Sequence, residues 1–348
     1  MSKDQGKPSK HMNPKFRFAG RKLLSTDDLL AGIKEGNRSI LGQAITLIES
    51  NASKDVQAAN ELVEKCLPLS GNSIRVGITG VPGVGKSTFI ESFGKILADQ
   101  GKKVAVLAVD PTSQQTSGSI LGDKTRMEEL SGHENAFIRP SPSDGSLGGV
   151  ARKTRETILL CEAAGYEVIL VETVGVGQSE IAVHSMVDYF LLLMLAGAGD
   201  ELQGIKRGIM EMADSIAITK ADTGNLEKAR LARMEYKRAL HLFPPSKKKW
   251  TPNVNVISSV KNENIDLIWE DITNYTDQMK QSGWLSDNRA NQAHYWLTES
   301  IKEQLGNSFY NHPTIQNEIP VFEDKVKKGE ISPYKAADQL MEIYFRTK

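Results

Sequence analysis

The feature that most constrains the fold is a glycine-rich turn between a strand-like and a helix-like segment. Residues 74–79 (IRVGIT) form an apolar run typical of a buried strand, and residues 88–100 have helical character. Between them, residues 80–87 (GVPGVGKS) have the spacing of a phosphate-binding loop. In such a loop, backbone N–H groups surround a polyphosphate at the positive N-terminal end of the following helix. The sequence therefore predicts a nucleotide site here.

The residue types in this loop indicate which groups contact the nucleotide. Lys86 is expected to reach the β- and γ-phosphate oxygens, and the Ser87 hydroxyl is expected to bind Mg²⁺. The residues expected to line the nucleotide are Gly80, Val81, Pro82, Gly83, Val84, Gly85, Lys86, Ser87 and Thr88. The alternative is a glycine-rich turn that binds no ligand. The strand and the helix on its two sides favour the phosphate-binding interpretation.

Composition excludes several classes of function. The 348 residues include 43 Lys and Arg and 43 Asp and Glu, so no global field attracts nucleic acid or an anionic membrane. The only two cysteines, Cys66 and Cys161, argue against a structural zinc site and are expected to be buried. The longest apolar run, residues 189–198, is too short to span a bilayer. We expect a cytoplasmic protein, or a mitochondrial matrix protein if the source is eukaryotic, with no nucleic-acid or membrane partner.

Hydrophobic periodicity divides the chain into four regions. Residues 1–25 are basic and are expected to form a flexible tail, and residues 26–70 show helical spacing. Residues 71–262 alternate strand-like and helix-like segments, which, with the phosphate-binding loop, predicts an α/β P-loop domain with a mostly parallel sheet flanked by helices. Residues 263–348 are helical again and are expected to mediate dimerisation.

Two further strand-like runs end in a carboxylate. Asp110 follows residues 103–109, and Glu172 follows residues 167–171. Ligands of a parallel α/β sheet gather at the carboxyl ends of its strands. Together with Ser87, both carboxylates are therefore expected to serve Mg²⁺, directly or through water. The alternative for each is a turn or cap residue.

A four-residue motif predicts which base is bound. Residues 219–222, Thr-Lys-Ala-Asp, resemble the guanine-recognition motif of GTPases, in which Asn usually stands in place of Thr219. The Asp222 carboxylate is expected to accept hydrogen bonds from the guanine N1–H and amine, while the Lys220 stem lies along the ring. Adenine lacks these donors, so Asp222 discriminates against ATP. A loop against the base is expected at Ser258, Ser259 and Val260.

The segment that follows Glu172 predicts slow hydrolysis. Glu172 to Gly175 stands where many GTPases carry Asp-x-x-Gly, and Val176 stands where Ras-like enzymes have the glutamine that positions water. We therefore expect a low intrinsic rate that a partner or a rearranged loop increases. The residues expected to support catalysis are Lys86, Glu172, Gln178, Arg126 and Lys206. Ordinary surface roles are the alternative for the last three.

Five motifs together resemble the MeaB/ArgK family of P-loop GTPases. They are GVPGVGKST at 80–88, VDPTS at 109–113, GSILGDKTRM at 118–127, ETVGVGQSE at 172–180 and TKAD at 219–222. The resemblance runs from about residue 26 to the C-terminus. It implies a homodimeric GTPase that binds GTP or GDP with Mg²⁺ and chaperones an adenosylcobalamin-dependent acyl-CoA mutase, typically methylmalonyl-CoA mutase. It also implies that the chaperone gates cofactor loading and protects the mutase, and that the loop bearing Lys206 contacts the mutase.

Three other functions remain open at this stage. A targeting GTPase of the signal-recognition type has a similar Thr-Lys-x-Asp-Gly motif, but it has Asp-Thr-Ala-Gly in place of residues 172–175. A metal-inserting GTPase usually carries Cys and His near its switches, whereas Cys161 and His184 have no close Cys or His neighbours in the sequence. A kinase or ATPase acting on a transport protein is disfavoured by the guanine motif.

Overall fold

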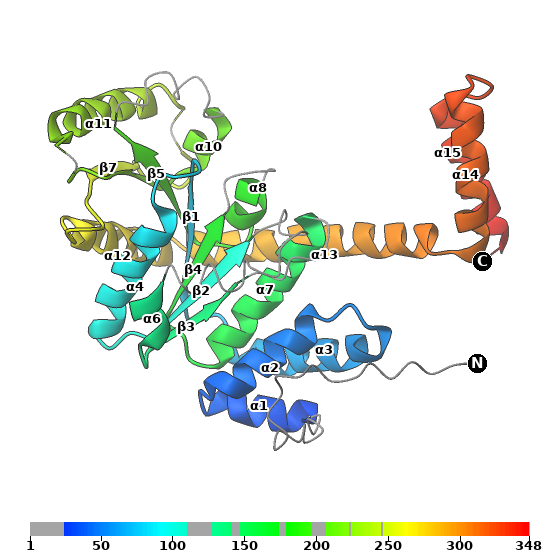
Figure 1. Cartoon of the computed structure of the whole chain (residues 1–348), viewed down its shortest axis with the longest axis horizontal. Coiled ribbons are helices and arrows are strands. Elements are labelled where there is room, and N and C mark those ends of the chain that lie inside the picture. The colour runs from blue at the N-terminus through cyan, green and yellow to red at the C-terminus, as the bar shows by residue number, and fades with distance from the viewer. Residues whose placement is uncertain are drawn as a thin grey trace, which may run out of the picture.

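A sheet of seven parallel strands forms the centre of the computed structural model (Figure 1). The strand order β3-β2-β4-β1-β5-β6-β7 places β1 between β4 and β5. The strands are β1 Ile74–Gly80, β2 Val104–Val109, β3 Ala136–Arg139, β4 Val168–Thr173, β5 Tyr189–Leu195, β6 Ser215–Thr219 and β7 Asn253–Val256. The predicted α/β fold with its mostly parallel sheet is confirmed. The short edge strand β3 is an addition that the sequence patterns did not predict.

The structure describes seven stretches of the chain. They are residues 24–109, 127–140, 147–173, 179–196, 207–222, 224–244 and 246–347. Most of the expected basic tail thus lies outside the described residues. No helix within these stretches is both long enough and apolar enough to cross a membrane.

Strand β5 shows how the two faces of the sheet are covered. Successive strand residues point to opposite faces. Phe190, Leu192 and Met194 pack on one face with residues of α7, α8, α10 and α11, whereas Leu191 and Leu193 pack on the other with residues of α4, α6 and α12. These helices are α4 Lys86–Asp99, α6 Glu128–Gly132, α7 Leu147–Ala163, α8 Ser179–His184, α10 Arg207–Met212, α11 Leu226–Leu240 and α12 Ile265–Gln281. The strand is apolar throughout because both of its faces are buried.

Three helices before the first strand extend the core on the α7 face. They are α1 Thr26–Lys34, α2 Arg38–Glu49 and α3 Ser53–Cys66, followed by the 3-10 turn Leu67–Leu69. Their buried side chains, among them Ile33, Ile45 and Leu62, belong to the same apolar cluster as those of α7. Figure 1 shows these helices beside α7. They therefore bury the outer side of a helix that would otherwise be solvated.

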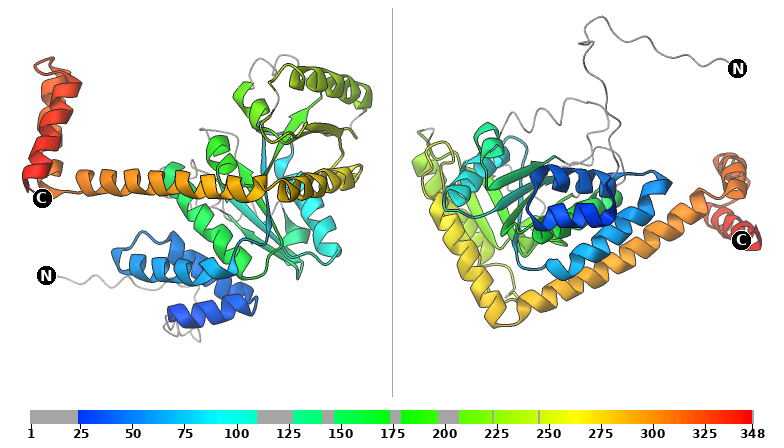
Figure 2. Two further views of the ribbon diagram at one scale, coloured as in Figure 1. Left: turned by 180° about the vertical axis from the view of Figure 1, so that it is seen from behind. Right: turned by 90° about the horizontal axis from the view of Figure 1, so that it is seen from below.

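A helical arm leaves the sheet after α12. Helix α13, Trp284–Tyr310, has 27 residues and is therefore roughly 40 Å long. Its first part runs along the body, and its second part projects away to a hairpin of α14 (Pro313–Lys327) and α15 (Pro333–Thr347) (Figures 1 and 2). The predicted helical character of the C-terminal region is confirmed. The arm leaves much apolar side-chain surface exposed.

Two buried ion pairs lie at the amino-terminal ends of the central strands β1 and β5. The Arg75 Nε donates to Glu162 Oε1 at 2.9 Å, and a second guanidinium nitrogen donates to Glu162 Oε2 at 2.9 Å. Burial alone would raise the pKa of Glu162, but Arg75, with hydrogen bonds from Ser73 and Gly71, lowers the pKa below its ordinary value. Nearby, Arg289 of α13 contacts Asp188 at 2.6 Å and the Ser73 carbonyl at 2.7 Å. This contact anchors the arm to the sheet.

The buried pair predicts a large stability effect. Replacing Glu162 by Gln should lower the free energy of unfolding by about 3 kcal/mol, because it leaves the Arg75 guanidinium buried without a counter-charge. The measurement is urea unfolding followed by circular dichroism. Glu61→Gln is the matched control, because Glu61 pairs with Lys65 at the surface and should change stability by less than about 1 kcal/mol. Equal effects of the two substitutions would contradict this prediction.

Both cysteines are buried, as expected. Cys66 and Cys161 are each fully inaccessible to solvent and form no disulfide. Burial raises the pKa of the Cys66 thiol to about 11 and raises that of Cys161 further. Both therefore stay protonated and act as small apolar side chains in the core.

Candidate functional site

The backbone of the predicted phosphate loop requires glycine at defined positions. Gly80, Gly83 and Gly85 have φ values of 152°, 79° and 97°, which L side chains rarely adopt. A Cβ atom on Gly80 would lie 2.5 Å from the carbonyl oxygen of Leu193 on the neighbouring strand. The loop therefore curls close against β5 and delivers the chain to the N-terminus of α4.

The other loop residues differ in exposure. Pro82 and Gly83 are exposed, Val81 is half-buried and Val84 is buried beneath the loop. In the first turn of α4, Ser87 is half-buried and Thr88 is exposed. The free N–H groups of this first turn and the open side of the loop thus lie together. This is the geometry that favours an anionic ligand at a helix N-terminus.

Lys86 places a cation directly over the loop. Its Nζ donates to the carbonyl oxygens of Gly80 at 2.8 Å and Val81 at 3.3 Å, and the residue is only 8% exposed. Burial lowers the pKa of Lys86, while the nearby Glu172 and Glu180 carboxylates oppose this shift by favouring the ammonium form. A bound polyphosphate would add negative charge and would favour the ammonium form further.

Ser87 and Glu172 meet at the carboxyl end of β4. The Ser87 Oγ donates to Glu172 Oε1 at 3.2 Å, so two oxygen ligands of the kind that Mg²⁺ prefers lie together beside the loop. In the described stretches, no group of three or more His, Cys, Asp or Glu side chains could hold a metal by itself. This pair fits Mg²⁺ in the manner of nucleotide sites, where phosphate oxygens and water complete the coordination.

A buried hydroxyl pair joins the loop to the strand that carries Glu172. The Thr173 Oγ1 donates to the Thr79 Oγ1 at 2.9 Å, and both residues are at most 1% exposed. Thr79 immediately precedes the first glycine of the loop, and Thr173 ends β4. This contact fixes the ends of β1 and β4 relative to each other, one residue along β4 from Glu172.

Thr219 supports the loop from the base-binding motif. Its Oγ1 donates to the Val84 carbonyl at 2.7 Å and lies 3.3 Å from the Met194 carbonyl. Thr219 thus braces the phosphate loop from the position at which GTPases usually have Asn. The replacement of Asn by Thr puts the usual bracing of the loop in question from sequence alone, and the hydrogen bond to Val84 shows that Thr219 supplies it.

Removing this brace should loosen the loop. Thr219→Val keeps the side-chain shape and removes the donor, so the buried Val84 carbonyl loses its partner at a cost of about 1–2 kcal/mol. We expect weaker GTP binding, measured as a higher Kd by titration calorimetry. Thr298→Val is the control, since Thr298 is exposed and its hydroxyl donates to the His294 carbonyl within helix α13. An unchanged Kd for Thr219→Val would show that the brace is not needed.

Asp222 offers a sheltered acceptor beside the loop. Its Oδ1 is inaccessible to solvent and has no hydrogen-bond partner among the described residues. Lys220 has a φ of 59°, and its Cε would lie 3.9 Å from a Cβ on Gly85. The Lys220 stem therefore runs along the phosphate loop, and Asp222 lies two residues beyond it. A buried unpaired carboxylate oxygen is costly unless a ligand supplies the donor.

The loop after β7 lies next to this motif. The Ala221 N–H donates to the Ile257 carbonyl at 3.3 Å, which joins the end of β6 to the start of the Ser258–Val260 loop. Ser258 is buried, Ser259 is half-buried and Val260 is 74% exposed. The structure thus brings the two segments predicted to contact the base to neighbouring positions.

Several predicted site residues lie outside the described residues. These are Asp110, Arg126, Val176, Gln178 and Lys206. β2 ends at Val109, which pairs with Thr173 of β4, so the strand that precedes Asp110 ends beside the strand of Glu172. The proposed roles of these residues stay predictions.

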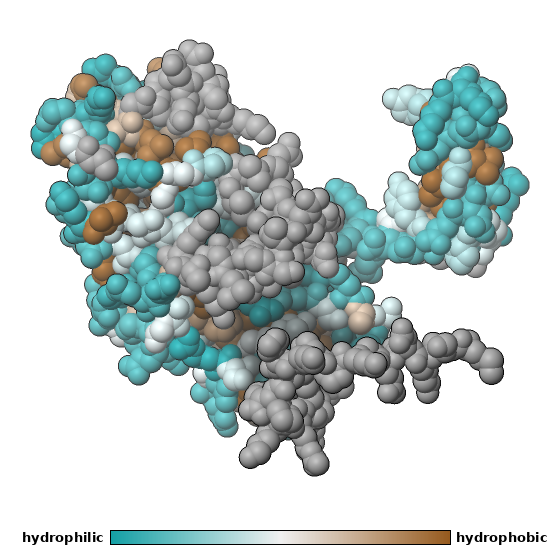
Figure 3. Space-filling view, viewed as in Figure 1, coloured by the Kyte–Doolittle hydropathy of each residue, from teal (hydrophilic) through white to brown (hydrophobic). Residues whose placement is uncertain are grey.

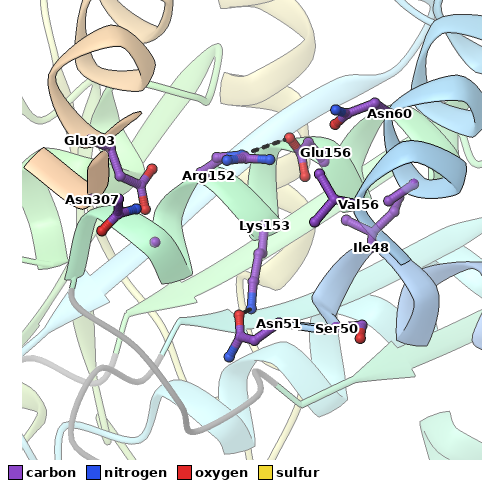
Figure 4. Close-up of a pocket in the computed structure, with 12 residues that line it drawn as sticks. Ile48, Ser50, Asn51, Val56, Asn60, Arg152, Lys153, Glu156, Glu303 and Asn307 are labelled. Carbon is purple, nitrogen blue, oxygen red and sulfur yellow. Dashed lines mark hydrogen bonds and ion pairs between the residues drawn. The ribbon is translucent and has the colours of Figure 1, made fainter. Parts of the chain in front are cut away.

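A separate cavity of about 390 Å³ lies between the α2–α3 helices, α7 and α13 (Figure 4). Its two cations already have hydrogen-bond partners within the chain. Arg152 Nε donates to Glu156 at 3.0 Å, and Lys153 Nζ donates to the Glu49 carbonyl and to Asn51 Oδ1, both at 2.6 Å. Arg152 is thus paired with a carboxylate and Lys153 is held by two uncharged oxygens. Among its described lining residues, the cavity also lacks a glycine-rich turn such as the one around Lys86.

Comparison with known proteins agrees with this geometry. The sequence profile of a family described as methylmalonyl Co-A mutase-associated GTPase MeaB matches residues 41–314. The GTPase ArgK of Escherichia coli strain K12 is 45% identical over 311 residues, 89% of this chain and 94% of that protein. The mitochondrial methylmalonic aciduria type A homolog of Mus musculus is 47% identical over 328 residues, 91% of this chain and 79% of that protein.

A solved structure has the same fold over nearly the whole chain. It is described as a LAO/AO transport system kinase, and it superposes with a TM-score of 0.73 at 37% sequence identity. The superposition covers 92% of this chain and 99% of that structure. It therefore includes the helical regions on both sides of the sheet domain.

Proposed function

The chain belongs to the MeaB family of methylmalonyl-CoA mutase-associated GTPases, and from this premise we propose that it is a GTP-dependent chaperone of an adenosylcobalamin-dependent acyl-CoA mutase. It hydrolyses GTP to GDP and phosphate at a low intrinsic rate, gates the loading of adenosylcobalamin into the mutase and protects the mutase from inactivation. Methylmalonyl-CoA mutase is the proposed partner. The proposed place of action is the compartment that holds the mutase: the cytoplasm, or the mitochondrial matrix in a eukaryote.

One observation supports this role above the others. The family match covers residues 41–314, so it includes the nucleotide site and the whole of the arm helix α13 as well. The family of mutase-associated GTPases thus shares with this chain both the nucleotide site and helix α13, which nucleotide binding does not require. The mouse relative, whose printed name refers to methylmalonic aciduria, points to the same metabolic context.

We propose the following roles, from the geometry for the described residues and from the sequence motifs for Asp110, Gln178, Arg126 and Lys206. Lys86 and the loop N–H groups bind the β- and γ-phosphates, and Asp222, Lys220 and the Ser258–Val260 loop bind guanine. Ser87 and Glu172, with Asp110, would hold Mg²⁺, which neutralises phosphate charge when bound. Gln178 is proposed to order the attacking water. Arg126 and Lys206 are proposed to stabilise developing charge or to contact the partner.

We also propose that residues 263–348 form a homodimer contact. The end of α13 and the α14–α15 hairpin enclose an apolar hollow of about 880 Å³, lined by residues that include Leu305, Phe309, Leu340 and Phe345. Leu305 and Phe345 are 60% and 68% exposed, and Figure 3 shows hydrophobic side chains on the projecting hairpin. A second copy would cover this surface, which is too apolar to stay solvated at low cost.

Adding charge to this surface should separate the dimer. Leu305→Glu combined with Phe345→Glu should weaken self-association by at least about 100-fold, because burying two carboxylates in an apolar contact is strongly unfavourable. The measurement is molar mass by light scattering across a concentration series. Leu67→Glu is the control, because Leu67 is 51% exposed and lies far from the arm in the sequence. A monomeric wild-type protein, or a dimeric double variant, would contradict the proposed contact.

The chaperone role is tested with the apo-mutase of the same organism. The rate of holo-mutase formation from adenosylcobalamin, and the survival of mutase activity during turnover, are measured with and without this chain. Each is measured with GTP, GDP and no nucleotide. We expect both quantities to depend on the chain and on the nucleotide. If loading and survival are the same without the chain, the proposed role is wrong.

A further inference from the structure

Helix α11 carries an apolar face that nothing in the described structure covers. Its inner residues Ala229, Ala232 and Tyr236 pack on the sheet. On the opposite side, Leu231 and Met234 are 58% and 49% exposed, and Leu242, just after the helix, is 80% exposed. Positions three, four and seven residues apart share one face of a helix. The exposed residues therefore form a stripe, and the helix is apolar on two opposite sides.

This stripe is unusual within the nucleotide-binding part of the chain. Between residues 71 and 262, six large hydrophobic side chains are exposed among the described residues, and four of them lie on α11 or directly after it. They are Leu226, Leu231, Met234 and Leu242; the other two are Ile181 and Val260. Figure 3 shows hydrophobic side chains interrupting the polar surface in the region where Figure 1 places α11. Gathered apolar surface of this kind is typical of a binding face.

Helix α11 and the loop that follows it are together strongly basic, although the whole chain is neutral. Residues 226–250 contain eight Lys and Arg against two Glu, a net charge of +6, while the full sequence has 43 of each sign. Three of these cations are already occupied: Arg230 by Glu227, Arg233 by the Val254 carbonyl and Lys248 by the buried Asp214.

The remaining cations of this segment are free to meet a partner. Within the described stretches, no carboxylate pairs with Lys228, Lys237, Arg238, Lys247 or Lys249. Arg238 lies on the stripe itself, seven residues after Leu231 and four after Met234, and the exposed Glu235, four residues after Leu231, lies beside it. Cationic and apolar groups therefore share this face, and residues 226–250 keep a net charge of +6 with Glu235 counted. We call the surface of Leu231, Met234, Lys237, Arg238 and Leu242 the α11 face.

We propose that the α11 face is a docking surface for the mutase, and that the matching mutase surface is acidic with an apolar centre. This inference rests on the proposed function. Charge complementarity defines the occupant, because a basic rim selects carboxylates and the stripe of Leu231, Met234 and Leu242 requires apolar contact. Duplex nucleic acid would satisfy the cations but would leave this stripe solvated. A protein surface satisfies both.

The position of α11 explains how docking could affect the nucleotide site. The helix begins at Leu226, four residues after Asp222 and seven after the end of β6 at Thr219. A partner held on the α11 face therefore contacts the element that directly follows the guanine-binding motif. Docking here is expected to change the rate of GDP release as well as to provide affinity.

The test measures binding of the holo-mutase from the same organism to variants of the full-length chain. One variant, Lys237→Glu with Arg238→Glu, reverses the charge, and another, Leu231→Ser with Met234→Ser, removes the apolar stripe. The control, Lys54→Glu with Lys280→Glu, makes the same charge change at two exposed positions on α3 and α12. Titration calorimetry gives Kd at NaCl concentrations from about 0.05 to 0.3 M, a range that spans strong and weak screening. Thermal unfolding, light scattering and basal GTP hydrolysis check that each variant is intact.

We expect the charge reversal to raise Kd by about 10- to 100-fold and to remove most of the salt dependence, as for close interfacial charge pairs. The apolar variant should raise Kd by about 10-fold and keep the salt dependence. The control should bind like the wild type. If both α11 variants bind the mutase as the wild type does, the α11 inference is wrong and the chaperone proposal stands. If the wild type does not bind the mutase, the chaperone proposal itself fails.

A second experiment tests whether the α11 face binds an anionic membrane instead of the mutase. Vesicles that contain phosphatidylserine are sedimented with the wild type and with the charge-reversal variant. We expect no binding of either protein. Vesicle binding that the variant loses, with mutase binding unchanged, would assign the α11 face to an anionic lipid surface and would overturn docking to the mutase.

Discussion

Lys86→Ala should reduce kcat/KM for GTP by at least about 100-fold, the loss typical of removing one preorganised group that stabilises transition-state charge. Lys86 is the cation held over the phosphate loop by the carbonyls of Gly80 and Val81. The other lysine of α4, Lys95, pairs with Glu129 at the surface and cannot take its place. Steady-state hydrolysis, followed by phosphate release, measures the effect.

The matched control for this substitution lies on the same helix. Lys95→Ala removes an equal charge and side-chain volume from α4 but leaves the loop intact, so hydrolysis should stay within about twofold of the wild type. Circular dichroism checks that both variants are folded. If Lys86→Ala retains wild-type kcat/KM, the loop around Lys86 is not the catalytic phosphate site.

Asp222→Asn should change which nucleotide the protein accepts. The carboxylate accepts two hydrogen bonds from guanine, whereas an asparagine amide presents one donor where guanine also has a donor. We expect KM for GTP to rise by about 100-fold or more, because a site built to pair buried polar groups rejects a mismatched partner strongly. Xanthosine triphosphate, which has a carbonyl in place of the guanine amine, should become the better substrate.

The control for the base prediction is Asp277→Asn. Asp277 is an exposed carboxylate on α12 and is not part of the predicted base site. Its amide variant should keep the wild-type preference for GTP over ATP and over xanthosine triphosphate. An Asp222→Asn protein with the same preference would show that another group reads the base, and would remove the main argument against the kinase or ATPase alternative.

Much of the fold was predictable because its signals are local. The buried strands around the phosphate loop are continuous apolar runs, and the helical spacing of the arm is visible in the sequence. The edge strand β3 gave no such signal, since Ala136–Arg139 is only four residues long and ends in Arg139. The projection of α13 away from the sheet could not be predicted either, because its part beyond Trp296 leaves the core while keeping helical periodicity.

The site was predictable where a motif fixes chemistry and was hidden where tertiary contacts do. Phosphate binding is predicted by the spacing of Lys86 and Ser87 in the loop, and guanine binding is predicted by the carboxylate of Asp222. The brace from Thr219 to Val84 and the hydroxyl pair of Thr79 and Thr173 join residues 94 or more positions apart. Such contacts depend on how the strands are ordered in the sheet, which a single sequence does not state.

The most direct test of the central claim is GTP hydrolysis by the purified protein with Mg²⁺, alone and with the mutase of the same organism, and with ATP in place of GTP. We predict a slow rate with GTP, a higher rate when the mutase is added and negligible turnover of ATP. A fast rate that the mutase does not change, or equal use of ATP, would contradict the account of this protein as a mutase-associated GTPase chaperone.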